Sequence, residues 1–76
     1  MKRHHLKIKP DYLKAILDGD KTFEIRKNDR DFQVGDRVHL YDGERYLIIR
    51  IKYITDFAQQ EGYVVFSFDW IHGGVL

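Results

Sequence analysis

The fold is decided by the stretch Pro10-Asp11-Tyr12-Leu13-Lys14-Ala15-Ile16-Leu17-Asp18-Gly19-Asp20-Lys21-Thr22-Phe23-Glu24-Ile25-Arg26, because its hydrophobic period changes half-way. The first half carries apolar residues at helical spacing, namely Tyr12, Leu13, Ile16 and Leu17. Pro10 suits a first helical position, where its missing N–H is not needed, and Gly19 suits the end of a helix. These signals predict a helix at about 10–18.

The second half alternates between apolar and polar residues, which is typical of a strand. Phe23 and Ile25 share one face, while Thr22, Glu24 and Arg26 share the other. We therefore expect Phe23 and Ile25 to point into the core. The whole stretch then reads as helix, tight turn and strand.

Four more strands are predicted at about 3–8, 37–41, 44–55 and 63–70. Asp42-Gly43 indicates a hairpin turn, 57–62 a connector and Gly73-Gly74 a frayed terminus. On one face the strand at 44–55 has Leu47, Ile49, Ile51 and Tyr53, although apolar residues on its other face also allow a bulge. The last strand has Val64, Phe66, Phe68 and Trp70 on one face.

Open sheets expose their edges, whereas closed barrels do not. We therefore expect an α+β, mostly β chain that forms a single domain at 1–76, a barrel of five to six strands with one helix plugging an end. Its core should pack Leu13, Ile16 and Leu17 on Phe23, Ile25, Val38, Ile49 and Phe66.

The amino-acid composition excludes several kinds of site. The 76 residues contain no cysteine, so disulfides and thiolate metal sites are excluded. His4 and His5 are adjacent and would point to opposite faces of a strand, so we expect no metal and no cofactor. No apolar run is long enough to be a signal peptide or membrane span, and we expect a cytoplasmic protein without a membrane partner.

The charges are unevenly distributed. Net charge is only +1, but residues 1–30 hold nine Lys and Arg against five Asp and Glu, and residues 31–76 hold four against seven. A local positive face can attract phosphate even on a nearly neutral protein. A merely solvated surface is the alternative explanation.

The most informative segment is Gly19-x-Lys21-x-x-Glu24-x-Arg26. Glu24 and Arg26 share a strand face and can pair, and an Arg held by a carboxylate is a rigid fork for a phosphate or a base edge. Lys21 lies at the turn beside them. We predict a basic cleft built on Lys21, Glu24 and Arg26, with Thr22, Lys27 and Arg30 at its rim. The alternative is a surface salt bridge worth about 0–1 kcal/mol.

This G-x-K-x-x-E-x-R segment resembles that of the ASCH domains, and the resemblance is closest to short stand-alone prokaryotic and phage-type members. It extends to Lys9-Pro10-Asp11-Tyr12, to Phe32-x-Val34-Gly35-Asp36 and to Glu61-Gly62-Tyr63-Val64-Val65. The resemblance implies a PUA-like barrel and a module that binds RNA or a nucleotide or nucleoside.

One branch of that family hydrolyses the amide of N4-acetylcytidine, and the resemblance assigns this chemistry to a Lys, a Thr three residues later and a distant Glu. Lys21 matches the Lys, but Glu24 stands where Thr is needed, and Thr22 lies two positions too early. We therefore expect a binding module. An amidohydrolase using Lys21 and Glu24 is the alternative, and a protein-interaction domain is a third.

Overall fold

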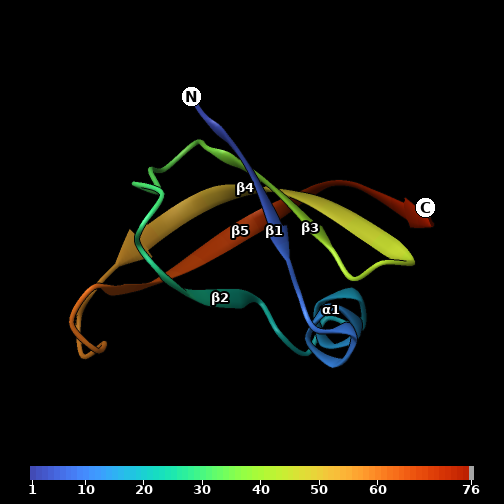
Figure 1. Ribbon diagram of the computed structural model, residues 1–76, viewed down its shortest axis with the longest axis horizontal. Coiled ribbons are helices and arrows are strands. Elements are labelled where there is room, and N and C mark those ends of the chain that lie inside the picture. The colour runs from blue at the N-terminus through green and yellow to red at the C-terminus, as the bar shows by residue number, and fades with distance from the viewer. Residues whose placement is uncertain (76) are drawn as a thin grey trace.

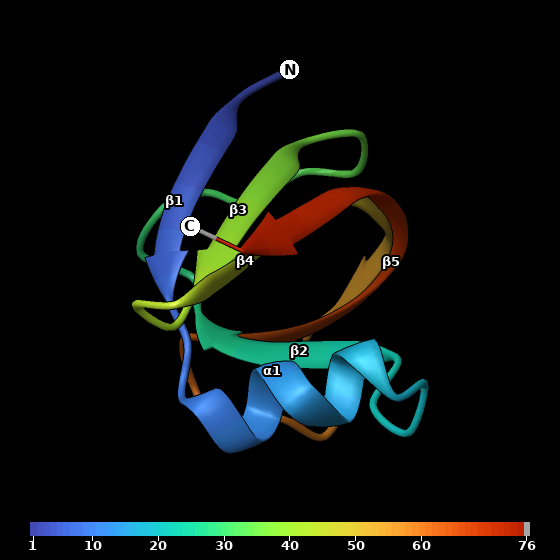
Figure 2. The ribbon, with the colours of Figure 1, turned by 90° about the vertical axis from the view of Figure 1, so that its right-hand side faces the viewer.

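One sheet of five strands forms most of the molecule: β1 (Arg3–Lys7), β2 (Phe23–Lys27), β3 (Arg37–Tyr41), β4 (Arg45–Thr55) and β5 (Tyr63–Val75). The computed structural model describes residues 1–75, and its sheet has the order β1-β3-β4-β5-β2 (Figures 1 and 2). β1 and β3 run parallel, while the other neighbours are antiparallel. The predicted mostly β fold with one helix is confirmed. The sheet curls into a half-barrel, whose open side lies between its edge strands β1 and β2.

The helix α1 (Pro10–Leu17) lies beside the end of β1 and the start of β2 (Figures 1 and 2). It begins at Pro10, after an extended Lys9, and Asp18 caps its end, one residue short of the predicted limit. Gly19 then adopts a φ of 83°, a left-handed conformation that glycine adopts without steric cost. The chain can therefore turn at once toward β2. Within residues 1–75 no helix has the length and apolarity to span a membrane.

The core fills the concave side of the sheet beneath α1. Leu13 and Ile16 are fully buried, and Leu17 packs against the same cluster. The expected core residues of the later strands, Val38, Ile49 and Phe66, are buried as predicted.

The expectation for β2 is wrong, because its faces are reversed. Phe23 and Ile25 are 42% and 49% exposed, whereas Glu24 is 2% exposed. Glu24 can enter the interior because Lys21 and Arg26 pair with its carboxylate. A paired and hydrogen-bonded carboxylate is the form in which such a charge can be buried. Phe23 and Ile25 therefore turn outward.

The long strands β4 and β5 depart from simple alternation in two places. The pairing register shifts between Ile51 and Tyr53, and Tyr53 is 63% exposed although the sequence pattern placed it on one face with Ile49 and Ile51. It shifts again where Ile49 pairs with Trp70 and Ile48 with His72, and Trp70 is 52% exposed. Such bulges change the direction of a strand and disrupt its alternation.

The predicted frayed end is also wrong, since Gly73 and Gly74 pair with Leu47 and Tyr46 within β5. A Cβ on Gly73 would lie 3.1 Å from the carbonyl oxygen of Tyr46, and one on Gly74 would lie 3.3 Å from the Tyr46 ring. Glycine therefore lets β5 run close against Tyr46.

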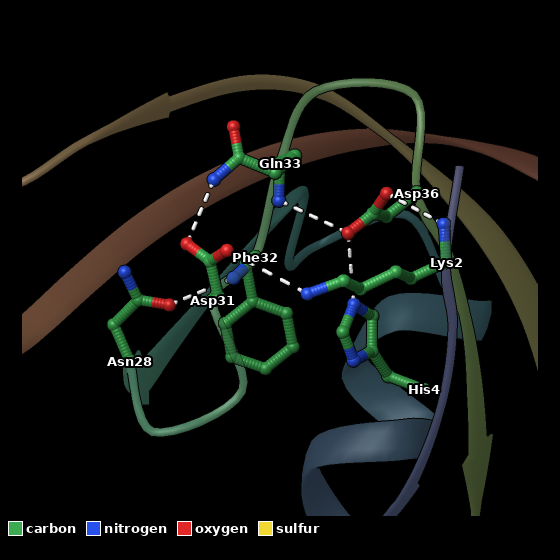
Figure 3. A network of polar contacts seen from close by, with 7 residues as sticks. All are labelled: Lys2, His4, Asn28, Asp31, Phe32, Gln33 and Asp36. Carbon is green, nitrogen blue, oxygen red and sulfur yellow. Dashed lines mark hydrogen bonds and ion pairs between the residues drawn. The ribbon is translucent and has the colours of Figure 1, made fainter.

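A buried polar network anchors the start of β1 (Figure 3). The Asp36 carboxylate accepts hydrogen bonds from the Lys2 and Gln33 backbone amides and lies 2.9 Å from Nε2 of His4. Phe32 packs edge-on against the His4 ring at 4.7 Å. Burial alone would raise the pKa of Asp36, but these hydrogen bonds outweigh it and hold the pKa below its usual value.

Truncating the core should unfold much of this small domain. Phe66 is 1% exposed, so Phe66→Ala should lower the free energy of unfolding by about 3–5 kcal/mol. Phe57→Ala, at an 82% exposed position, is the matched control and should change it little. Urea denaturation measures both, and equal midpoints for the two variants would contradict the core assignment.

Asp36 should make the fold sensitive to acid. Its folded pKa lies below 3.8, so its stabilising contribution is present above that pH and is lost as the pH falls through the folded pKa. Asp36→Asn should therefore be less stable than the natural chain at pH 6, and the difference should shrink toward pH 2. Denaturation at several pH values measures it, and a difference independent of pH would count against the network.

Candidate functional site

A cleft lies at the open side of the half-barrel, between the end of β1, α1 and β2. Its volume is about 490 Å³. Because no strand within residues 1–75 pairs with this edge of β2, residues of both faces of β2 reach the cleft. The lining residues are Lys7, Ile8, Lys9, Tyr12, Lys21, Phe23, Glu24, Ile25 and Arg26.

Glu24 forms the centre of the site. Its Oε1 accepts a hydrogen bond from Lys21 Nζ, and its Oε2 accepts one of 2.8 Å from Arg26 Nε. The carboxylate is almost fully buried, but the Lys21 and Arg26 side chains keep 19% and 25% of their surface exposed. The carboxylate thus orients two cations whose remaining surface can reach a ligand.

Arg26 also connects the two edges of the sheet. Its Nη2 donates a 3.1 Å hydrogen bond to the carbonyl oxygen of Lys7, at the end of β1. This contact spans the gap where a closed barrel would have a strand pairing. Arg26 is therefore fixed at two points, and its guanidinium orientation is set before any ligand arrives.

Tyr12 forms an aromatic wall of the cleft. It belongs to the predicted apolar stripe of the helix, but it is 50% exposed. Lys21 Nζ lies 4.8 Å from the Tyr12 ring centroid, and Lys9 Nζ lies 5.7 Å from it. Cations at such distances are attracted to an aromatic face.

Positively charged side chains predominate in the cleft. Four of its lining side chains are cationic (Lys7, Lys9, Lys21 and Arg26) and Glu24 is the one carboxylate among them. An anionic ligand would therefore be attracted here.

The comparisons with known proteins agree with this fold. A family model described as Domain of unknown function (DUF3850) matches residues 3–68. The chain belongs to this family. The DUF3850 match runs from the start of β1 to Phe68 in β5 and so includes every residue of the cleft. No curated protein matches the chain.

Among solved structures, this DUF3850 chain is similar to the crystal structure of hypothetical protein PH0355. The two are 18% identical over 93% of this chain and 100% of that chain, with a TM-score of 0.69. At this identity the likeness shows the fold alone. Neither description names a ligand or a reaction, so a function has to be argued from the cleft.

Three of the six residues singled out in the sequence come together here: Lys21, Glu24 and Arg26. Thr22, Lys27 and Arg30 are exposed and do not line the cleft. Pattern reasoning missed Lys7, Lys9 and Tyr12. The signal for them was Pro10, which places a strand-to-helix corner directly after Lys9.

The histidines do not gather into a metal site. His4 points inward to Asp36, while His5 is exposed on the opposite face of β1. In the described part of the chain no group of three or more His, Cys, Asp or Glu could hold a metal ion.

Neutralising the Glu24 carboxylate should lower the free energy of unfolding, even though glutamine has nearly the same size as glutamate. Glu24→Gln leaves Lys21 and Arg26 without their shared charge, so the free energy of unfolding should fall by about 2 kcal/mol. Glu44→Gln, at an exposed position, is the matched control. Urea denaturation compares the two, and equal stability would show that the buried carboxylate is not needed for the fold.

Proposed function

We propose that the cleft binds a nucleotide, either free or as one unit of a single-stranded RNA. The observation that carries this proposal is the set of four cations around one buried carboxylate. A phosphate would meet Lys and Arg groups that the fold already holds in place, which favours binding. The volume of about 490 Å³ lies within the range of about 300–1,000 Å³ that is common for small-molecule sites.

Arg26 is the main phosphate ligand in this proposal. A guanidinium has five N–H donors, of which Glu24 and the Lys7 carbonyl use two, so three are left for a ligand. Lys21 likewise has three donors, of which Glu24 uses one. Because Arg26 is already oriented, little conformational freedom is lost when phosphate binds.

The base would lie against the aromatic side of the cleft. Tyr12 and Phe23 are both half exposed beside Lys21. Stacking on aromatic side chains is a common way to hold single-stranded RNA bases, and it tolerates different bases. Thr22, Lys27 and Arg30 lie outside the cleft, so in this proposal they contact only phosphates beyond it.

Arg26→Ala and Lys21→Ala should each weaken nucleotide binding by about ten- to a hundredfold, since each removes a charge-assisted hydrogen bond. Lys14→Ala is the matched control, because Lys14 is a lysine of α1 that does not line the cleft. Titration calorimetry with the four ribonucleoside monophosphates measures binding, and thermal melts check folding. Equal affinity in all three variants would contradict the proposal.

Salt dependence separates phosphate binding from other binding. Each neutralised phosphate of a single strand should add about −0.7 to the slope of log K against log salt. The natural chain should therefore bind nucleotides more weakly at higher salt, and Arg26→Ala should show a flatter slope. A nucleoside without phosphate should bind with little salt dependence.

Amide hydrolysis of a modified nucleoside is the second candidate, favoured by the direct contact of the Lys21 amine with the Glu24 carboxylate inside the cleft. Glu24 would take a proton from water as the oxygen attacks the acetyl carbon, and Lys21 would stabilise the oxyanion. As the oxyanion collapses and the C–N bond breaks, Glu24 would pass that proton to the leaving nitrogen, which releases acetate and cytidine. The salt bridges of Glu24 favour binding over this role, because they occupy both of its oxygens. Turnover of N4-acetylcytidine that Lys21→Ala abolishes would place hydrolysis first.

A further inference from the structure

A row of three arginines crosses the outer face of the sheet, away from the core. Arg3 in β1 pairs in register with Arg37 in β3, which pairs with Arg50 in β4. Neighbouring strands lie about 4.8 Å apart, and like charges directly opposite one another are destabilising. The row therefore lowers the stability of the sheet unless an anion lies over it.

Few carboxylates compensate this row. Asp69 lies 3.8 Å from Arg50, but it also lies 3.6 Å from Lys52 and is shared between them. Within residues 1–75, Arg3 and Arg37 have no carboxylate within 4.0 Å. The Nε atom of Arg37 is buried without a hydrogen-bond acceptor in that part of the chain. The two neighbouring guanidinium groups of Arg3 and Arg37 thus have no carboxylate partner in that part of the chain.

Aromatic rings lie directly beside the arginine row. His5 and His39 pair in register, and their ring centroids are 4.5 Å apart. Tyr41 and Tyr46 follow one row further along and line a hollow of about 350 Å³ with these histidines, Leu40 and Ile48. Flat rings beside cations suit stacked bases next to phosphates.

The positive charge of the arginine row acts on the neighbouring His39 ring. Burial lowers the pKa of His39 most, and the positive charges of His5, Arg3 and Arg37 lower it further. The arginines and the histidine rings therefore lie on one surface, close enough for the arginine charges to act on the His39 ring.

This outer surface is continuous with the cleft. Lys7 lies in the same row as Tyr41 and Tyr46, and it also lines the cleft. A smaller hollow of about 210 Å³, lined by Lys7, Ile8, Tyr41, Asp42 and Gly43, joins the two. A chain that leaves the cleft past Lys7 would reach Tyr41 next, then the histidines, then the arginine row.

We propose that the ligand is a single-stranded nucleic acid several nucleotides long, and that the outer face of β1, β3 and β4 holds the part that extends beyond the cleft. Arg3, Arg37 and Arg50 would contact its phosphates, and the rings of His5, His39, Tyr41 and Tyr46 would stack its bases. The proposal rests on the proposed function for the nucleotide in the cleft. An acidic protein segment would match the arginines but would leave the rings unused, so nucleic acid is favoured.

The test measures affinity against ligand length. Fluorescence anisotropy with labelled oligouridylates of two and eight nucleotides, together with calorimetry of uridine monophosphate, is applied to the natural chain and to the double variant Arg3→Gln/Arg37→Gln. The octamer should bind the natural chain about tenfold or more tighter than the monophosphate, because it neutralises additional phosphates. The double variant should lose most of that gain and flatten the octamer salt slope by about 1.4, while its monophosphate affinity stays unchanged.

Two controls test whether a loss of octamer binding comes from the outer surface. Lys14→Gln removes one positive charge away from both surfaces and should leave the length dependence intact. The melting temperature of the double variant should stay the same or rise, because the substitutions relieve repulsion between neighbouring arginines. Loss of octamer binding with a preserved fold then reports on the surface itself.

The outcomes separate this inference from the proposed function. If the octamer binds no tighter than the monophosphate, or binds the double variant with full affinity, the outer surface is overturned while the cleft stands. If Arg26→Ala changes neither ligand's affinity, the cleft is overturned instead. Equal binding of a labelled octaglutamate would overturn the nucleic-acid assignment and point to an acidic protein partner.

Discussion

The buried Glu24 carboxylate is the constraint on which the rest of the structure depends. Removing a carboxylate from water costs several kcal/mol unless oppositely charged groups bind it. Lys21 supplies one such group from the turn after α1, and Arg26 supplies the other from β2 itself. Because Arg26 also reaches the carbonyl oxygen of Lys7, the pairing that makes the burial tolerable also links the two free edges of the sheet. The cleft is therefore cationic for a structural reason, and a ligand can use the same charges.

Among the described strands, the edge strand β1 pairs with β3 alone, so its two ends need other anchors. At its start the Lys2 amide donates to Asp36, whose carboxylate also lies against His4. At its end the Lys7 carbonyl accepts from Arg26. Charged hydrogen bonds thus hold both ends of a strand whose own apolar contact with the core is Leu6, with Ile8 directly after it. A short chain without cysteine gains stability in this way where disulfides would serve in others.

Local sequence signals predicted the elements well but not the faces of every strand. Pro10 and Gly19 placed the helix to within one residue, and Asp42-Gly43 placed the hairpin between β3 and β4. In β2 either of the two alternating sets of residues could face the core. Hydrophobicity alone predicts that this set is Phe23 and Ile25. The deciding fact is that Lys21 and Arg26 satisfy the Glu24 carboxylate while the distant Lys7 carbonyl oxygen accepts from Arg26, and the local pattern does not contain that second contact. The arginine row was hidden for a similar reason, since Arg3, Arg37 and Arg50 become neighbours only through strand register.

The reversal of β2 also bears on what the cleft can hold. With Glu24 and Arg26 turned inward, Phe23 and Ile25 lie half exposed at the cleft, next to Tyr12 and Lys21. A small inorganic anion would leave these apolar surfaces exposed to water, which is unfavourable. A ligand with both a planar apolar part and a phosphate would cover them and meet the cations in one binding mode. The pairing of exposed rings with fixed cations, present both in the cleft and along the outer face, is the strongest physical argument for a nucleotide over a simple anion.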